Sequence, residues 1–215
     1  MADKDSFQIV FLCTGNRARS AMAEAFVRKM TQDLPVEVSS AGLLELEAGP
    51  ALPEAVLASS RVGIDLSEHR SRPITQTKFD HTDLVLGFER QHISTAVVDG
   101  GADPGKSFLL RELLRLLDSL PLEDPSGDGI ERAKMKVASA HRFRVTAPNF
   151  SVDDEIADPY GKEERVFDRL ANELYRSCAA LTESLFGVKV SLIDIPEPVG
   201  STRPKGGFLG KLKRG

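Results

Sequence analysis

The chain has few cysteines, no long apolar run and no histidine cluster. Its two cysteines, Cys13 and Cys178, imply no disulfide framework. No apolar run approaches the roughly 18 residues of a membrane-spanning helix, and residues 1–8 lack the apolar segment of a secretory signal. His81, His92 and His141 show no metal-ligand spacing, and we place them in solvent or on a helix surface. We therefore expect a cytoplasmic protein without metal, cofactor or stable membrane insertion.

The overall composition is that of a globular protein. Of its 215 residues, 41% are hydrophobic and 28% are charged, and the net charge of −4 argues against nucleic-acid binding. We expect a single domain over residues 1–190, because this length can bury a full core. Residues 191–215 are rich in proline, glycine and, towards the end, basic residues, so we expect a disordered basic tail there. Contact of this tail with acidic lipid or a partner is the alternative.

Apolar strand-like runs alternate with helical patterns along the chain. Strands are predicted over residues 7–12, 36–40, 83–88 and 107–110. Helical spacing follows each of them, at residues 18–33, 53–61, 89–98 and from 110 onward, and again at 130–144 and 167–185. This alternation predicts an α/β fold in which a four-stranded parallel sheet is flanked by helices on both sides, a Rossmann-like three-layer arrangement. We interpret residues 120–154 as an insertion, either a lid or docking surface or a neutral addition.

Residues 13–20, which read CTGNRARS, form the turn from the first strand to the first helix. Such a turn directs free backbone N–H groups and the positive end of the helix dipole into the space above the strand. Gly15 and Asn16 tolerate the positive φ angles that fold successive amides into a concave anion site. The turn therefore predicts a cradle for an oxyanion such as phosphate.

The two ends of this turn supply reactive groups. Cys13 lies beside the amides and Arg19, and positive groups favour the nucleophilic thiolate form of a cysteine. Arg19 offers a planar fork that can grip two oxygens of a tetrahedral oxyanion. Together these groups predict nucleophilic attack on a phosphorus or arsenic centre.

Four motifs occur in the same order in a known enzyme family. They are residues 13–20, residues 40–42 (SAG), residues 69–72 (HRSR) and residues 158–161 (DPYG) before the last helix. Over about residues 7–188 the chain resembles the low-molecular-weight protein tyrosine phosphatases, and it looks like a bacterial member. The family fold is a four-stranded parallel sheet flanked by helices, which agrees with the pattern above.

The resemblance implies a role for each matching residue. Asp158 corresponds to the family's general acid, and Tyr160 to an aromatic wall of the substrate cleft, although a loop tyrosine packed on a helix is the alternative. Ser40 and His69 match a network that supports the cradle, with a surface histidine as the alternative for His69. Besides the catalytic Cys13 and Arg19, the loop residues expected to hold phosphate are Thr14, Gly15, Asn16, Arg17, Ala18 and Ser20.

These roles predict hydrolysis of phosphotyrosine through a phosphocysteine intermediate. The expected partner is a phosphotyrosine-containing protein, with a tyrosine kinase among the candidates, and Arg17 either favours acidic phosphopeptides or is a solvated rim residue. The alternative is a thiol-dependent arsenate reductase on the same fold. Internal disulfide relay is disfavoured because residues 87–161 contain no cysteine. A phosphate-binding module without turnover is disfavoured because every expected catalytic group is present.

Overall fold

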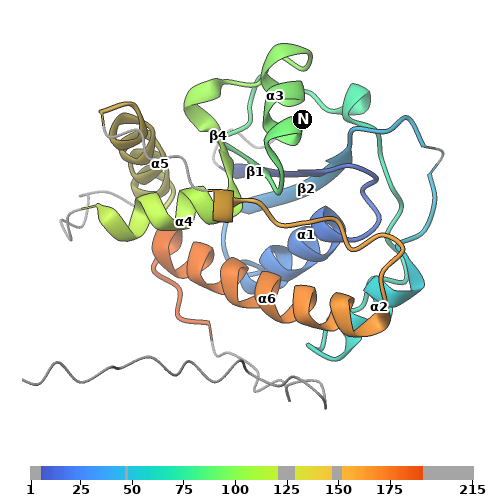
Figure 1. Ribbon diagram of the computed structural model, residues 1–215. Helices are drawn as coiled ribbons and strands as arrows, with labels where there is room; N and C mark the ends of the chain where they lie inside the picture. Colours follow the sequence, from blue (N-terminus) through green and yellow to red (C-terminus); the bar gives the residue numbers. More distant parts are fainter. Residues whose placement is uncertain (1–5, 47, 121–128, 147–151, 191–215) are drawn as a thin grey trace, which may run out of the picture.

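Four parallel strands form the centre of the molecule (Figure 1). The computed structural model describes residues 6–46, 48–120, 129–146 and 152–190. The strands are β1 (Phe7–Cys13), β2 (Val36–Gly42), β3 (Leu84–Gly87) and β4 (Ser107–Leu109), in the spatial order β2-β1-β3-β4. The predicted four-stranded parallel sheet is therefore confirmed. Because β1 lies between β2 and β3, the ends of both neighbours flank the turn after Cys13.

Helices cover both faces of the sheet, which confirms the three-layer prediction. Along β1, Phe7, Ile9 and Phe11 enter one buried cluster, while Val10 and Leu12 enter another on the opposite face. In Figure 1, α3 lies above the sheet and α1 and α6 lie below it. The helices are α1 (Arg19–Met30), α2 (Pro53–Ser60), α3 (Arg90–Val98), α4 (Leu110–Ser119), α5 (Gly129–Thr146) and α6 (Glu164–Phe186).

The apolar stripe predicted for the last helix is buried along its whole length. α6 packs on α1, α2, α4 and α5, and Gly187 ends it in the left-handed conformation, with φ of 72°. The buried members of the predicted stripe are Phe167, Leu170, Leu174, Cys178, Leu181 and Leu185. Its charged side chains lie on the other side. Within the described ranges, no helix combines the length and apolar character that crossing a bilayer requires.

The third strand is shorter than the predicted range 83–88. It ends at Gly87, because the backbone N–H of Phe88 donates to His92 Nδ1 (3.2 Å) rather than to a neighbouring strand. Three short 3₁₀ turns complete the described elements: η1 (Ile74–Gln76), η2 (Pro104–Lys106) and η3 (Val152–Asp154).

The segment interpreted as an insertion contains α5, which packs on α4 and α6. Its buried face consists of Ala133, Val137 and Ala140, the residues that helical spacing predicts. Residues 121–128 and 147–151 lie outside the described part, so the insertion over 120–154 stays a prediction. The predicted basic tail, residues 191–215, also lies outside the described residues.

Candidate active site

The predicted strand-to-helix turn is present at the carboxyl end of β1. β1 ends at Cys13 and α1 begins at Arg19. Of the two residues expected to tolerate positive φ here, only Asn16 adopts it, with φ of 52°, and it is the one non-glycine residue of the described chain that does so; Gly15 does not have a positive φ. Within the described residues, the backbone N–H groups of Gly15, Arg17 and Ala18 donate to no protein acceptor. These amides are therefore available to an anion, as the motif predicts.

The Cys13 thiol is almost wholly buried, with 3% of the residue exposed, and it borders a cavity. Its sulfur lies 2.9 Å from Ser20 Oγ and accepts a hydrogen bond from the backbone N–H of Asn16 at 3.2 Å. Ser20 Oγ accepts from Asn16 Nδ2 at 2.9 Å, so the serine hydrogen is free to point at the sulfur. The surroundings thus offer two donors to a thiolate.

Asn16 connects the turn to the neighbouring segments. Its side chain donates to Ser40 Oγ on β2 (2.7 Å) and accepts from the backbone N–H of Arg72 (2.9 Å). The backbone carbonyl oxygen of Asn16 lies 2.7 Å from His69 Nε2, so this nitrogen must carry the hydrogen. Burial lowers the pKa of His69, and this hydrogen bond acts in the opposite direction. The structure brings Ser40 and His69 to the turn, as the resemblance implies.

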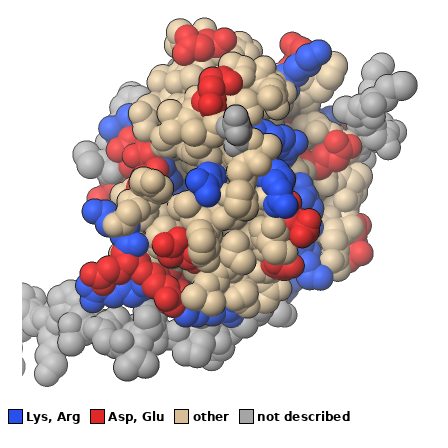
Figure 2. All heavy atoms as spheres, turned by 90° about the vertical axis from the view of Figure 1, so that its right-hand side faces the viewer, with Lys and Arg blue, Asp and Glu red and all other residues tan. Residues whose placement is uncertain are grey.

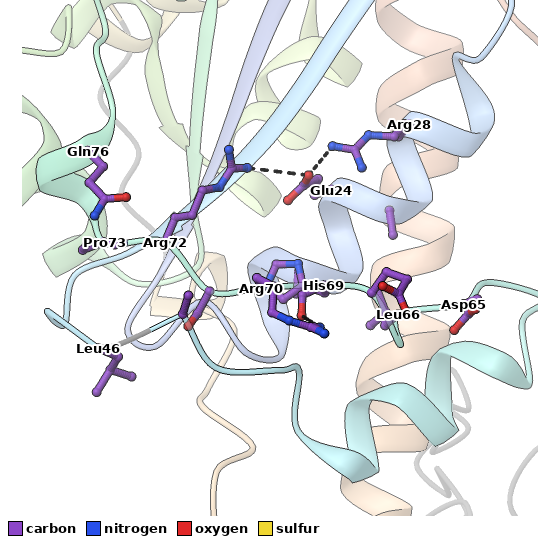
Figure 3. Close-up of a pocket in the computed structure, with 15 residues that line it drawn as sticks. Glu24, Arg28, Leu46, Asp65, Leu66, His69, Arg70, Arg72, Pro73 and Gln76 are labelled. Atoms are coloured by element: carbon purple, nitrogen blue, oxygen red, sulfur yellow. Dashed lines mark hydrogen bonds and ion pairs between the residues drawn. The ribbon is translucent and has the colours of Figure 1, made fainter.

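The support continues into a second, larger cavity of about 620 Å³ (Figure 3). Ser40 Oγ donates to the buried carboxylate of Glu24 on α1. Figure 3 shows Glu24 between the guanidinium groups of Arg28 and Arg72, and the closest approach of Arg72 is 3.9 Å. His69 also lines this cavity. The exposed guanidinium groups of Arg28 and Arg72 therefore stabilise the Glu24 carboxylate, which in turn accepts from the Ser40 hydroxyl that holds Asn16.

Arg19 is buried to 1% exposure and joins distant parts of the chain. Its Nη1 donates to Glu89 Oε2 (2.7 Å) and to the carbonyl oxygen of Ile156 (2.9 Å). Its Nη2 donates to Asp158 Oδ2 (2.5 Å) and, more weakly, to Thr14 Oγ1 (3.3 Å). Asp158 is 139 residues away in sequence, yet its carboxylate shares one guanidinium with the turn.

Cys13, Arg19 and Asp158 line the same cavity, of about 320 Å³. Tyr160 stands at its edge with 72% of its surface exposed, and its backbone N–H donates to Asp158 Oδ1 at 3.0 Å. Figure 2 views the side on which the strands end, where basic and acidic side chains are interspersed. The remaining lining residues are Thr14, Gly15, Arg17, Ala18, Leu44, Leu46 and Leu52.

The assignment of His92 to the surface is wrong. It lies in the first turn of α3, is fully buried, and contacts Thr14 Oγ1 through Nε2 at 3.2 Å. Burial lowers its pKa to about 4, and the nearby Arg19 acts in the same direction. His81 is exposed and His141 is partly exposed. In the described part of the chain, no group of three or more His, Cys, Asp and Glu side chains is placed to hold a metal ion.

A profile of the family described as "Low molecular weight phosphotyrosine protein phosphatase" matches residues 8–147. The chain belongs to this family. The predictions of the family and of its hydrolase class are thereby confirmed. The profile match stops before Asp158, so for this residue the position of its carboxylate on Arg19 is a separate observation.

Relatives in this phosphatase family have different names. A protein-arginine-phosphatase of Bacillus subtilis is 39% identical over 48% of this chain and 70% of its own length. An arsenate reductase 2 of Staphylococcus epidermidis is 42% identical over 38% of this chain and 60% of its own length. The crystal structure of a low molecular weight protein tyrosine phosphatase from T. tengcongensis superposes with a TM-score of 0.61, is 27% identical, and covers 84% of this chain and 100% of that one.

Proposed function

We propose that this phosphatase hydrolyses phosphotyrosine in proteins through a phosphocysteine intermediate. The observation that carries the proposal is the convergence of Cys13, Arg19 and Asp158 on one cavity. A thiol and a buried guanidinium meet there with a carboxylate 139 residues away from Arg19 in sequence, beside the unpaired amides of the turn. This set can attack a phosphoryl group, bind its oxygens and supply a proton.

The reaction takes two steps. The Cys13 thiolate attacks phosphorus, the bond to the phenolic oxygen breaks, and Asp158 gives its proton to that oxygen. Water then attacks the phosphorus of the phosphocysteine, Asp158 takes a proton from the water, and the P–S bond breaks, which releases inorganic phosphate and restores the Cys13 thiolate. The Ser20 hydroxyl, 2.9 Å from the sulfur, stabilises the thiolate that departs in this second step. The equatorial oxygens stay with the turn amides and Arg19 throughout.

The walls of the cavity support an aromatic substrate. Leu44, Leu46 and Leu52 line it together with Tyr160, so a flat phenyl ring finds apolar surface on several sides. Arg17 also lines the cavity, with Nε donating to the carbonyl oxygen of Pro50 at 2.8 Å. The positive guanidinium group of a phosphoarginine side chain would be repelled by Arg17, whereas a phosphotyrosine in an acidic peptide is attracted by Arg17.

The name of one relative raises arsenate reduction as the alternative. The cradle suits arsenate as well as phosphate, but reduction consumes thiols. The second cysteine, Cys178, is fully buried in α6, and burial raises the pKa of its thiol. An external thiol would therefore have to supply the electrons. Asp158 and Tyr160 favour ester hydrolysis, since a proton donor and an aromatic wall suit a phenolic leaving group.

Other parts of the sequence interpretation stay predictions. These are the bacterial origin, the cytoplasmic location and a tyrosine kinase as physiological substrate. They extend the proposal without supporting it.

A comparison of substrates tests the proposal. We expect turnover of p-nitrophenyl phosphate and phosphotyrosine peptides, with slower turnover of phosphoarginine and of arsenate with added thiol. Cys13→Ser should abolish turnover, and Asp158→Asn should lower it about 10²-fold for a poor leaving group and less for p-nitrophenolate. Faster turnover of phosphoarginine, or arsenate reduction without ester hydrolysis, would contradict the proposal.

A charge-removal pair tests the role of Arg17. Arg17→Ala should lower the preference for phosphotyrosine over phosphoarginine and reduce the advantage of acidic peptides. Lys29→Ala removes the same charge from an exposed position of α1 and serves as the matched control. Equal effects of the two changes would show that Arg17 acts only through net charge.

A further inference from the structure

We propose that His92 is a positioning residue that orients the Thr14 hydroxyl so that its hydrogen points at the bound phosphoryl group. The inference rests on the proposed phosphatase function and adds a donor to it. His92 lies on α3, beyond β3, whereas Thr14 follows β1. Their contact therefore depends on the adjacency of β1 and β3 in the sheet.

Gly87 allows this contact. It is the last residue of β3 and pairs with Leu12, one residue before Cys13. A Cβ at Gly87 would lie 2.9 Å from the Cβ of His92 and 3.0 Å from Ile93 Cδ1. Only the missing side chain thus lets α3 begin this close to the strand end, where the imidazole reaches the turn.

The hydrogen bonds of His92 define its tautomer. The backbone N–H groups of Phe88 and Glu89 both donate to Nδ1, at 3.2 Å and 3.0 Å, so this nitrogen carries no hydrogen. The hydrogen of the neutral ring is therefore on Nε2. This atom faces Thr14 Oγ1 at 3.2 Å, and it donates there. The Glu89 carboxylate is farther away, at 3.4 Å.

Thr14 Oγ1 then accepts two hydrogen bonds, from His92 Nε2 and from Arg19 Nη2 (3.3 Å). A hydroxyl oxygen has two acceptor sites and one hydrogen. With both acceptor sites used, the hydrogen points away from His92 and Arg19. Thr14 lines the cavity that contains Cys13, so an oxyanion held there can accept this hydrogen.

An additional donor aimed at a charged oxygen is a strong one. Hydrogen bonds to charged groups contribute more than neutral ones, and loss of one oxyanion donor in an enzyme costs roughly 10²–10³-fold in rate. The Thr14 hydroxyl is a partial contributor beside several amides, so we expect its removal to cost at least about tenfold in phosphate affinity and in kcat/KM.

The competing explanation is that His92 only caps α3. Its Nδ1 indeed accepts the N–H of Glu89, the residue before the helix. Two substitutions separate the roles. His92→Asn places an acceptor near Nδ1 but does not reach Thr14, whereas His92→Gln places an amide near Nε2 and gives up the cap. If His92 positions Thr14, His92→Asn should lose more phosphate affinity than His92→Gln. If His92 only caps α3, His92→Gln should lose more thermal stability than His92→Asn, and the phosphate affinities of the two variants should not differ.

The experiment measures the dissociation constant of inorganic phosphate, kcat and KM for p-nitrophenyl phosphate, and the melting temperature. Thr14→Val and His92→Asn should each weaken phosphate binding by about tenfold or more, and Thr14→Ser should recover most of the Val loss. The double variant Thr14→Val/His92→Asn should be no worse than Thr14→Val. Additive losses in the double variant, or phosphate binding unaffected by Thr14→Val, would overturn the proposal.

A spectroscopic measurement keeps the proposal testable if the variants fold poorly. Nitrogen NMR of the wild-type imidazole should show His92 with its hydrogen on Nε2, both with and without phosphate. A hydrogen on Nδ1 would refute the assignment. Wild-type protein that binds phosphate but turns over no ester would refute the proposed function, while the binding and NMR results would still decide the role of His92.

Discussion

Gly42 provides a test of how tightly the sheet constrains the phosphate cradle. This glycine ends β2, pairs with Cys13 and lies outside the turn of residues 13–20. A Cβ there would lie 2.9 Å from both the backbone N of Asn16 and the carbonyl C of Gly15, and 3.0 Å from the Thr14 carbonyl oxygen. All three are backbone atoms, so Gly42→Ala can be accommodated only by moving the cradle or the strand.

The expected cost follows from this crowding. Overpacking of this kind costs typically 1–3 kcal/mol, and for a chain of this size about 2 kcal/mol lowers Tm by roughly 4–8 °C. A displaced cradle also costs catalysis, because a misplacement of about 1 Å can lower the rate about 10²-fold. We therefore expect Gly42→Ala to lose phosphate affinity and kcat/KM as well as stability.

Gly15→Ala is the matched control. Gly15 belongs to the turn of residues 13–20 itself, yet a Cβ there would meet only Leu46 Cδ1, at an ordinary 3.7 Å. Melting temperature, phosphate affinity and turnover of p-nitrophenyl phosphate should therefore change much less than in Gly42→Ala. If the two variants lose equally, or if Gly42→Ala matches the wild type, the end of β2 does not constrain the cradle.

Three further predictions concern stability. Burial lowers the pKa of His92 to about 4 from about 6.5, in the presence of Arg19, Glu89, Asp158 and Glu155, so the unfolded chain binds more protons between these values. The free energy of unfolding should thus fall by up to roughly 3 kcal/mol as pH drops from 7 to 4. Urea titrations at several pH values measure this fall, and a His92→Asn variant whose free energy of unfolding depends on pH as strongly as that of the wild type would contradict it. Asn16→Gly relieves the positive φ but deletes three side-chain hydrogen bonds, so a net loss of about 2–4 kcal/mol is expected; an unchanged urea midpoint would refute it. Arg61, which directly follows α2, forms ion pairs with Glu164 and Asp168 of α6 at the surface. Arg61→Ala should cost under about 1 kcal/mol, and a calorimetric loss above twice that value would show a larger role.

The sequence predicts the layers, the motif turn and most of the buried helix faces, because each depends on local spacing. Cys13 and Arg19 belong to one contiguous motif, so their proximity needs no knowledge of the sheet. The pairing of Asp158 with Arg19 spans 139 residues, and only the resemblance to a family pointed to it.

His92 shows what local spacing misses. Its burial depends on the order of strands, which places β3 beside β1, and on the absence of a side chain at Gly87. Neither is encoded in the helical periodicity around residue 92. Glu89 was missed for the same reason, since its contact with Arg19 forms across two neighbouring strand ends. A histidine and a glutamate shortly after a strand-ending glycine were the available signals.

The burial of Cys178 bears on how the protein meets oxidants. Its sulfur lies against the Ala23 carbonyl oxygen at 4.0 Å, in the interface between α6 and α1, and the chain has no third cysteine. A sulfenic acid formed on Cys13 by peroxide therefore has no accessible thiol of its own chain with which to condense. Inactivation should be reversed by added glutathione or dithiothreitol only at low peroxide doses, and it should become permanent once the sulfinic acid forms. Spontaneous recovery without any added thiol would show that another route of repair exists.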